Sequence, residues 1–125
     1  MSWQGAAGSR IANVELTNTG PACRLAVMTR AQLIDGHGTI LIDGPAPTDL
    51  TTLNVAPGAL IKTMVRVGNY CGPVPGAPIS LAFVLAGNAG RISARAVSPT
   101  DTVGLPPCNG APGSAGSIEM QAWAP

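Results

Sequence analysis

Few residues of this 125-residue chain could carry out chemistry. His37 is the only histidine, it lies between Gly36 and Gly38, and Asp35 and Asp43 flank this segment. A histidine can act as a general base, and a pair of carboxylates can hydrolyse a glycosidic bond. The two glycines indicate a hairpin tip, where the imidazole is solvated and nothing orients a substrate. We therefore interpret His37 as a turn residue and the two aspartates as turn caps, and we expect no catalytic residue and no enzyme activity.

Metal binding is the alternative for the same residues. A weak calcium site at Asp35 and Asp43 would be poor, because calcium takes about six to eight oxygen ligands. Structural zinc needs nitrogen and sulfur ligands at regular spacing, and His37 with the three cysteines does not provide it. We expect neither a metal nor a cofactor.

The three cysteines, Cys23, Cys71 and Cys108, admit two interpretations. They are buried reduced thiols that act as small hydrophobic residues, or the protein is exported and two of them are paired. The segments around Cys71 and Cys108 are rich in proline and glycine, as expected of loops that cross the end of a sandwich and can be linked without bending a strand. We predict a Cys71–Cys108 disulfide, which leaves Cys23 free or bonded to a partner outside the chain.

Aromatic residues are also scarce. Trp3, Tyr70 and Trp123 would form a platform for a sugar if they met on the surface, whereas Phe83 fits an inward strand face. The alternative is that the three rings cover the ends of the core.

Charge and apolar runs exclude two classes of partner. Seven Lys and Arg residues against six Asp and Glu give a net charge of +1, with the charges scattered singly. Nucleic-acid binding needs clustered cations, so we expect no nucleic-acid partner. The longest apolar run, from Leu81 to Ala86, is too short to span a bilayer.

The low net charge weakens repulsion between copies, which favours a homo-oligomer or another protein or glycan partner.

The hydrophobic pattern has a period of two, which is typical of strands with one buried face. The clearest stretches are 12–17, 61–67, 79–85, 91–97 and 118–123, with turn residues between them. About eight short strands of this kind predict a single domain over residues 1–125, an all-β antiparallel sandwich.

Several strings of residues resemble a known family. They are Trp3-Gln4-Gly5-Ala6-Ala7-Gly8, Leu16-Thr17-Asn18-Thr19-Gly20, Cys23-Arg24-Leu25, Ala56-Pro57-Gly58, Asn69-Tyr70-Cys71 and Pro106-Pro107-Cys108. Together they resemble the domain of unknown function 4232, which occurs in exported proteins and lipoproteins of actinobacteria and Chloroflexi-like bacteria. The resemblance covers nearly the whole chain. It implies an immunoglobulin-like sandwich outside the cytoplasmic membrane, without catalytic residues.

The chain departs from this family at its front. Family members carry a further cysteine before the first string, near a signal peptide or lipobox, whereas this chain starts Met1-Ser2-Trp3. We therefore expect a trimmed chain, or a piece of a larger protein, in which the partner of Cys23 lies upstream. The predicted function is a non-enzymatic exported or cell-surface interaction or structural module, with carbohydrate binding through Trp3, Tyr70 and Trp123 as the alternative.

Overall fold

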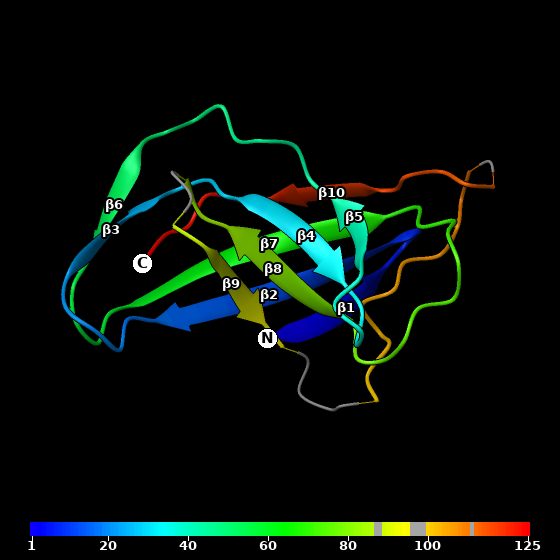
Figure 1. Cartoon of the computed structure of the whole chain (residues 1–125), viewed down its shortest axis with the longest axis horizontal. Helices are drawn as coiled ribbons and strands as arrows, with labels where there is room; N and C mark the ends of the chain where they lie inside the picture. Colours follow the sequence, from blue (N-terminus) through cyan, green and yellow to red (C-terminus); the bar gives the residue numbers. More distant parts are fainter. Residues whose placement is uncertain (87–88, 96–99, 111) are drawn as a thin grey trace.

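The computed structural model describes residues 1–86, 89–95, 100–110 and 112–125. All the regular elements in these residues that are longer than a turn are strands (Figure 1). They are β1 (Ser2–Ala6), β2 (Ser9–Thr17), β3 (Cys23–Ala26), β4 (Arg30–Ile34), β5 (Ile40–Asp43), β6 (Thr52–Val55), β7 (Leu60–Gly68), β8 (Ser80–Val84), β9 (Arg91–Ala94) and β10 (Ser117–Met120). The described residues contain no helix long and apolar enough to cross a membrane.

Two four-stranded sheets form the body of the domain. The first has the strand order β1-β2-β7-β10 and the second β5-β4-β8-β9, while β3 and β6 form a separate two-stranded sheet. Every strand pair is antiparallel. The predicted all-β antiparallel sandwich is therefore confirmed, although the described residues form ten strands instead of about eight.

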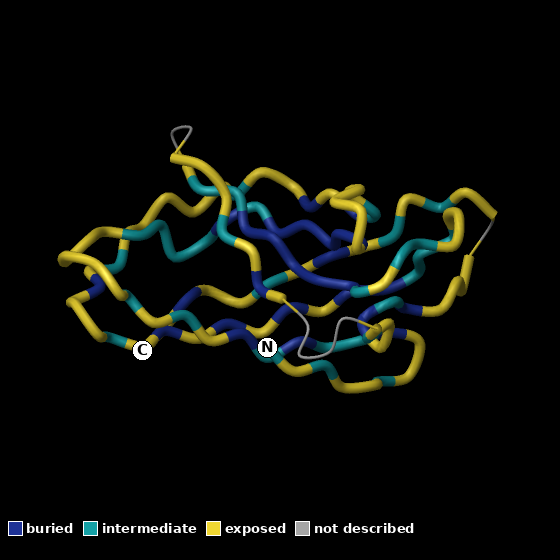
Figure 2. The backbone as a smooth tube through the Cα atoms, turned by 60° about the horizontal axis from the view of Figure 1, so that its bottom comes forward, coloured by how far each residue is buried: buried dark blue, intermediate teal, exposed yellow. Residues whose placement is uncertain are grey.

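The core lies between the two large sheets. Alternate side chains of β7 point into this space, whereas β4 and β8 are buried along nearly their whole length. In β7, Val65 and Val67 are fully buried while Met64 and Arg66 are exposed. Leu81 of the second sheet pairs with Leu33, and both are fully buried. Figure 2 shows these buried stretches along both layers, with exposed chain at the two ends of the molecule. Each such side chain stabilises the fold by about 1.5–3 kcal/mol.

The predicted hairpin at Gly36–Gly38 is present between β4 and β5. Asp35 donates its N–H to the Thr39 carbonyl, and Gly38 has a φ of 80°, a left-handed conformation that favours glycine. The strand β1 was not expected, and the strand predicted over 91–97 ends at Ala94; residues 96 and 97 lie outside the described residues.

The C-terminal segment differs in one respect from the strand predicted over 118–123, and this difference decides the position of Trp123. Met120 pairs with Val65, whereas Ala124 forms a bridge with Lys62. Three residues of the C-terminal segment therefore lie opposite two residues of β7, which is the arrangement of a β-bulge. One extra residue reverses the side-chain alternation, so Trp123 points into the core and is 2% exposed.

Candidate functional site

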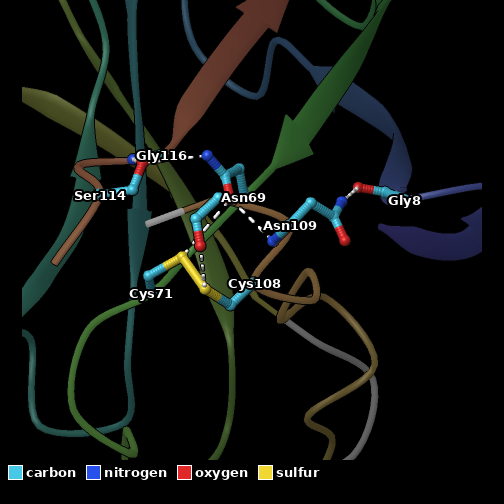
Figure 3. Close-up of a disulfide and its surroundings, with 8 residues drawn as sticks. Gly8, Asn69, Cys71, Cys108, Asn109, Ser114 and Gly116 are labelled. Carbon is cyan, nitrogen blue, oxygen red and sulfur yellow. Dashed lines mark hydrogen bonds between the residues drawn. A yellow bond between two sulfur atoms is a disulfide. The ribbon is translucent and has the colours of Figure 1, made fainter. Parts of the chain in front are cut away.

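The two longest connections of the sandwich meet at one end of the molecule. One joins β7 to β8 over residues 69–79, and the described part of the other joins β9 to β10 over residues 100–110 and 112–116. We call these residues the loop end. The predicted disulfide links them: Cys71 and Cys108 are bonded, with their Cα atoms 4.8 Å apart (Figure 3).

Asn69 organises both loops around this disulfide. Its φ of 56° is left-handed, a conformation in which asparagine is several-fold enriched. Its side-chain amide donates to Ser114 Oγ at 3.0 Å, and its side-chain oxygen accepts the N–H of Asn109 at 2.8 Å (Figure 3). Asn109 in turn donates to the carbonyl of Gly8 at 2.8 Å, which ties the loop end to the β1–β2 turn.

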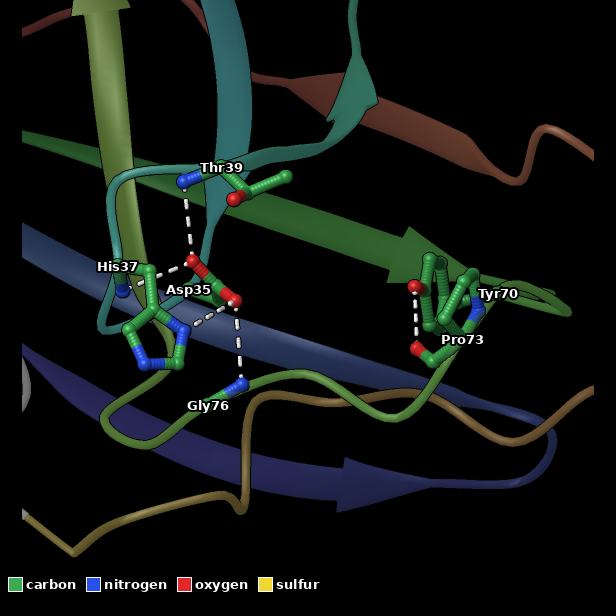
Figure 4. A network of polar contacts seen from close by, with 6 residues as sticks. All are labelled: Asp35, His37, Thr39, Tyr70, Pro73 and Gly76. Atoms are coloured by element: carbon green, nitrogen blue, oxygen red, sulfur yellow. Dashed lines mark hydrogen bonds and ion pairs between the residues drawn. The ribbon is translucent and has the colours of Figure 1, made fainter.

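Asp35 fixes the β7–β8 loop at its other end, close to β8. Its carboxylate is buried; Oδ1 accepts the N–H groups of His37 and Thr39, each at 2.9 Å, and Oδ2 accepts that of Gly76 at 3.1 Å (Figure 4). Gly36 also donates its N–H to the Gly76 carbonyl at 2.8 Å. The β4–β5 turn and the β7–β8 loop are thus held together by one bond from the Asp35 side chain and one between backbone groups.

These contacts shift the pKa of Asp35. Desolvation raises it, but the backbone N–H groups of Gly76, Thr39 and His37, together with the charge on the His37 imidazole, lower the pKa below its ordinary value of 3.8. The carboxylate is therefore the form that the native structure favours.

Val74 lies between Pro73 and Pro75 in the same loop, and it is 98% exposed. The hydroxyl of Tyr70 donates to the carbonyl of Pro73 at 2.6 Å (Figure 4). Beside this segment is an open groove of about 370 Å³, lined by Asp35, Thr39, Ile40, Leu41, Tyr70, Gly72, Pro73, Val74, Pro75 and Ser114. Ile40 is also exposed, so two exposed apolar side chains, Ile40 and Val74, lie at this groove.

The residues considered for catalysis are not assembled into a site. The His37 side chain is 79% exposed, and its Nδ1 lies 3.6 Å from Asp35 Oδ2. Asp43 lies opposite Gln32, away from the turn; it accepts the Gln32 amide at 3.1 Å and lies 3.7 Å from Arg30 Nε. The interpretation of Asp43 as a turn cap is therefore wrong, because the hairpin register places Asp43 beside β4, opposite Gln32. Within the described residues no group of three or more His, Cys, Asp or Glu side chains could hold a metal ion.

The three aromatic residues come from three different segments of the chain. Trp3 lies on β1 opposite Ala12, and its ring occupies the space that a Cβ at Gly104 would need. Tyr70 lies beyond the end of β7, at the loop end. A strict period of two over the predicted strand 118–123 places Trp123 on the strand face opposite Ile118. The bulge makes that prediction wrong: the ring is buried and offers no surface to a sugar.

Cys23 is free and exposed, on β3 at the end of the sandwich away from the loop end (Figure 1). It lines a groove of about 380 Å³ together with apolar residues that include Leu16, Leu25 and Val55. Its thiol forms no disulfide bond within the described residues.

The sequence analysis named Asn69 only as part of a string shared with a family and gave it no role, and it did not single out Val74 or Gly76. Asn69 and Gly76 depend on partners distant in the chain, which no local pattern indicates. For Val74 a signal existed: an apolar residue between two prolines, close to a cysteine, predicts an exposed and stiff loop.

A scan against protein-family models and searches of curated proteins and of solved structures found no match to this chain. The class that fold and site define is an all-β antiparallel sandwich domain with a disulfide between its two longest loops.

Proposed function

We propose that the chain is a non-enzymatic interaction module of an exported or cell-surface protein, and that it presents the loop end to a partner protein. The observation that carries this proposal is the position of Val74: a fully exposed apolar side chain on a loop held at both ends. Binding residues are often found on loops that a rigid scaffold positions.

The Cys71–Cys108 disulfide supports export. Disulfides persist in oxidising compartments and are rare in the cytosol, where thiols are kept reduced. The resemblance to the domain of unknown function 4232 supports the same location, and with it an immunoglobulin-like arrangement of the sandwich.

Self-association belongs to the same proposal. The net charge of +1 provides little repulsion between copies, and two four-stranded sheets leave edge strands that can pair. Sedimentation velocity over a range of concentrations tests for self-association, and a single monomer species at the highest concentration would contradict it.

The loop end is tested by site-specific photocrosslinking to envelope proteins. A photoreactive residue at position 74 is expected to give a saturable product that unlabelled wild-type protein competes away and the Val74→Asp variant does not. The same residue at position 50, where Leu50 is 68% exposed on another loop, is the matched control. Equal labelling from both positions would contradict the proposal.

A further inference from the structure

The sandwich is open at the end away from the loop end, because its two large sheets differ in length there. The strands β2 and β7 of the first sheet are nine residues long, whereas β4, β8 and β9 of the second sheet are four or five. Figure 1 shows β2 and β7 extending past the second sheet toward β3 and β6. The inward-facing pair at this end, Leu16 and Ile61, accordingly borders the groove of about 380 Å³ that also contains Cys23.

The walls of this groove are aliphatic and come from all three sheets. The apolar lining residues are Leu16, Leu25, Val55, Ile61, Leu85 and Ile92. Val55 and Ile61 are buried, whereas the other four are half-buried, so water reaches aliphatic side chains that border the core. A ligand that displaces this water gains hydrophobic free energy. The volume lies near the lower end of the range of small-molecule sites, about 300–1,000 Å³, which suits a single acyl chain.

Hydrogen bonds of Asn18 hold the groove open before any ligand binds. Its side-chain amide donates to the carbonyls of Val55 at 3.1 Å and Ala56 at 3.3 Å. Its backbone N–H donates to the Ala59 carbonyl at 2.9 Å, and its carbonyl accepts the N–H of Gly58 at 2.7 Å. The turn after β2 is thus fixed against the turn between β6 and β7. A ligand therefore finds a preformed groove and loses little affinity to ordering the protein.

Arg24 gives the groove its charge. Among the described residues that line the groove, Arg24 is the only charged one, and it is exposed. Its guanidinium takes part in no ion pair within the described part of the chain. A neighbouring groove shares Arg24, Cys23 and Val55, so the cation lies where the two grooves adjoin. A guanidinium pairs with a carboxylate through charge-assisted hydrogen bonds. Aliphatic walls with one unpaired cation complement an amphiphile with an anionic head.

We propose that this groove binds a free fatty acid, with the acyl chain against the aliphatic walls and the carboxylate at Arg24. The site lies at the opposite end of the sandwich from the loop end, and it does not depend on the proposed function.

The first test is a titration of the disulfide-bonded chain with octanoate, decanoate and dodecanoate, each below its micelle concentration. Isothermal titration calorimetry should find one ligand per chain. The affinity should rise about tenfold for every two methylenes, because each buried methylene contributes hydrophobic free energy. Saturating dodecanoate should also slow the reaction of Cys23 with a thiol reagent several-fold, because Cys23 lines the same groove.

The second test examines the head group at low ionic strength, where exposed charges are screened least. Wild-type protein should bind dodecanoate more tightly than dodecylammonium, which has the same chain and the opposite charge. Arg24→Glu should weaken dodecanoate binding about three- to tenfold and reverse this preference. Arg66→Glu is the matched control: it changes the net charge equally, but Arg66 is an exposed residue of β7 that does not line the groove.

The third test examines the aliphatic wall. Leu25→Gln should weaken the binding of both amphiphiles about three- to tenfold, because it places a polar group against the acyl chain. Met64→Gln is the matched control, since Met64 is 37% exposed on the outer face of β7. It should bind both amphiphiles like wild type. Thermal unfolding followed by circular dichroism establishes that each variant is folded.

Several results would overturn the inference. They are the absence of dodecanoate binding by folded wild-type protein, uptake of many ligands without saturation, and an unchanged reaction rate of Cys23 in saturating dodecanoate. Equal effects of Arg24→Glu and Arg66→Glu would refute the assigned anionic head group. Protection of Cys23 by phosphatidylglycerol vesicles but not by dodecanoate would assign the groove to a membrane surface. A dimer that blocks dodecanoate binding would assign it to a second copy. None of these results bears on the loop end.

Discussion

Phe83 and Trp123 lie edge to face, with ring centroids 5.0 Å apart and ring planes inclined by 67°. Phe83 belongs to β8 of the second sheet, whereas Trp123 lies in the C-terminal segment that pairs with β7 of the first. The contact therefore joins the two layers. The indole Nε1 donates to Thr29 Oγ1 at 3.4 Å, which satisfies the polar atom of a buried ring.

Replacing Trp123 should destabilise the domain strongly. Trp123→Ala removes a fully buried ring and leaves a cavity between the sheets, so we expect the free energy of unfolding to fall by about 3–5 kcal/mol. Trp123→Phe keeps the contact with Phe83 and should cost less. Denaturant unfolding followed by circular dichroism measures both, and an alanine variant within about 0.5 kcal/mol of wild type would mean that the ring is not in the core.

The stability of the domain should depend on pH through Asp35. Its pKa is lowered in the folded state, so its contribution is fully present above the ordinary value of 3.8 and is lost as the pH falls through the lower folded-state value. Asp35→Asn should reduce stability at pH 7 and flatten the loss of stability in acid. Denaturant unfolding at several pH values tests this, with Asp43→Asn as the exposed control. A pH profile of Asp35→Asn that matches the wild-type profile would contradict the assignment.

Removing the disulfide should destabilise the fold through the unfolded chain. The bond closes a loop with a sequence separation of 37, for which the chain-entropy relation gives about 3–4 kcal/mol. A Cys71→Ala/Cys108→Ala double variant should unfold at a correspondingly lower denaturant concentration, and Cys23→Ser should not. No change in the double variant would show that the loops are held without the bond.

The reactivity of Cys23 should identify it as the single accessible thiol. It is exposed and unpaired, so one equivalent of a thiol reagent should react with the native protein, and three should react after reduction and unfolding. Mass spectrometry of a non-reduced digest should find the label on Cys23 and a linked Cys71–Cys108 peptide. A linkage of Cys23 to Cys71 would contradict the structure.

The strands were predictable where burial alternates cleanly. Residues 61–67 fall within β7, and the Gly36–Gly38 turn joins β4 to β5, because glycine content and a period of two are local signals. The Cys71–Cys108 bond was also predictable, since both cysteines lie in loops of similar composition. In contrast, β1 contains glycine and alanine with no apolar alternation, and it becomes a strand only by pairing with β2.

The rest depended on contacts between distant residues. The bulge before Ala124 is set by pairing with Lys62, and the sequence of the last segment alone places Trp123 on the wrong face. The carboxylate of Asp35 was interpreted as a turn cap, and it does bind the N–H groups of His37 and Thr39. Its third partner, Gly76, lies 41 residues away, and no sequence pattern indicates it.

The segment around Val74 is held by groups that do not depend on the side chain at position 74. The hydroxyl of Tyr70 binds a carbonyl, the carboxylate of Asp35 binds an N–H, and the disulfide acts from position 71. Other residues can therefore occupy this position without changing the supporting structure. The domain is suited to grafting: libraries of short sequences could be displayed at this tip while the framework beneath them stays constant.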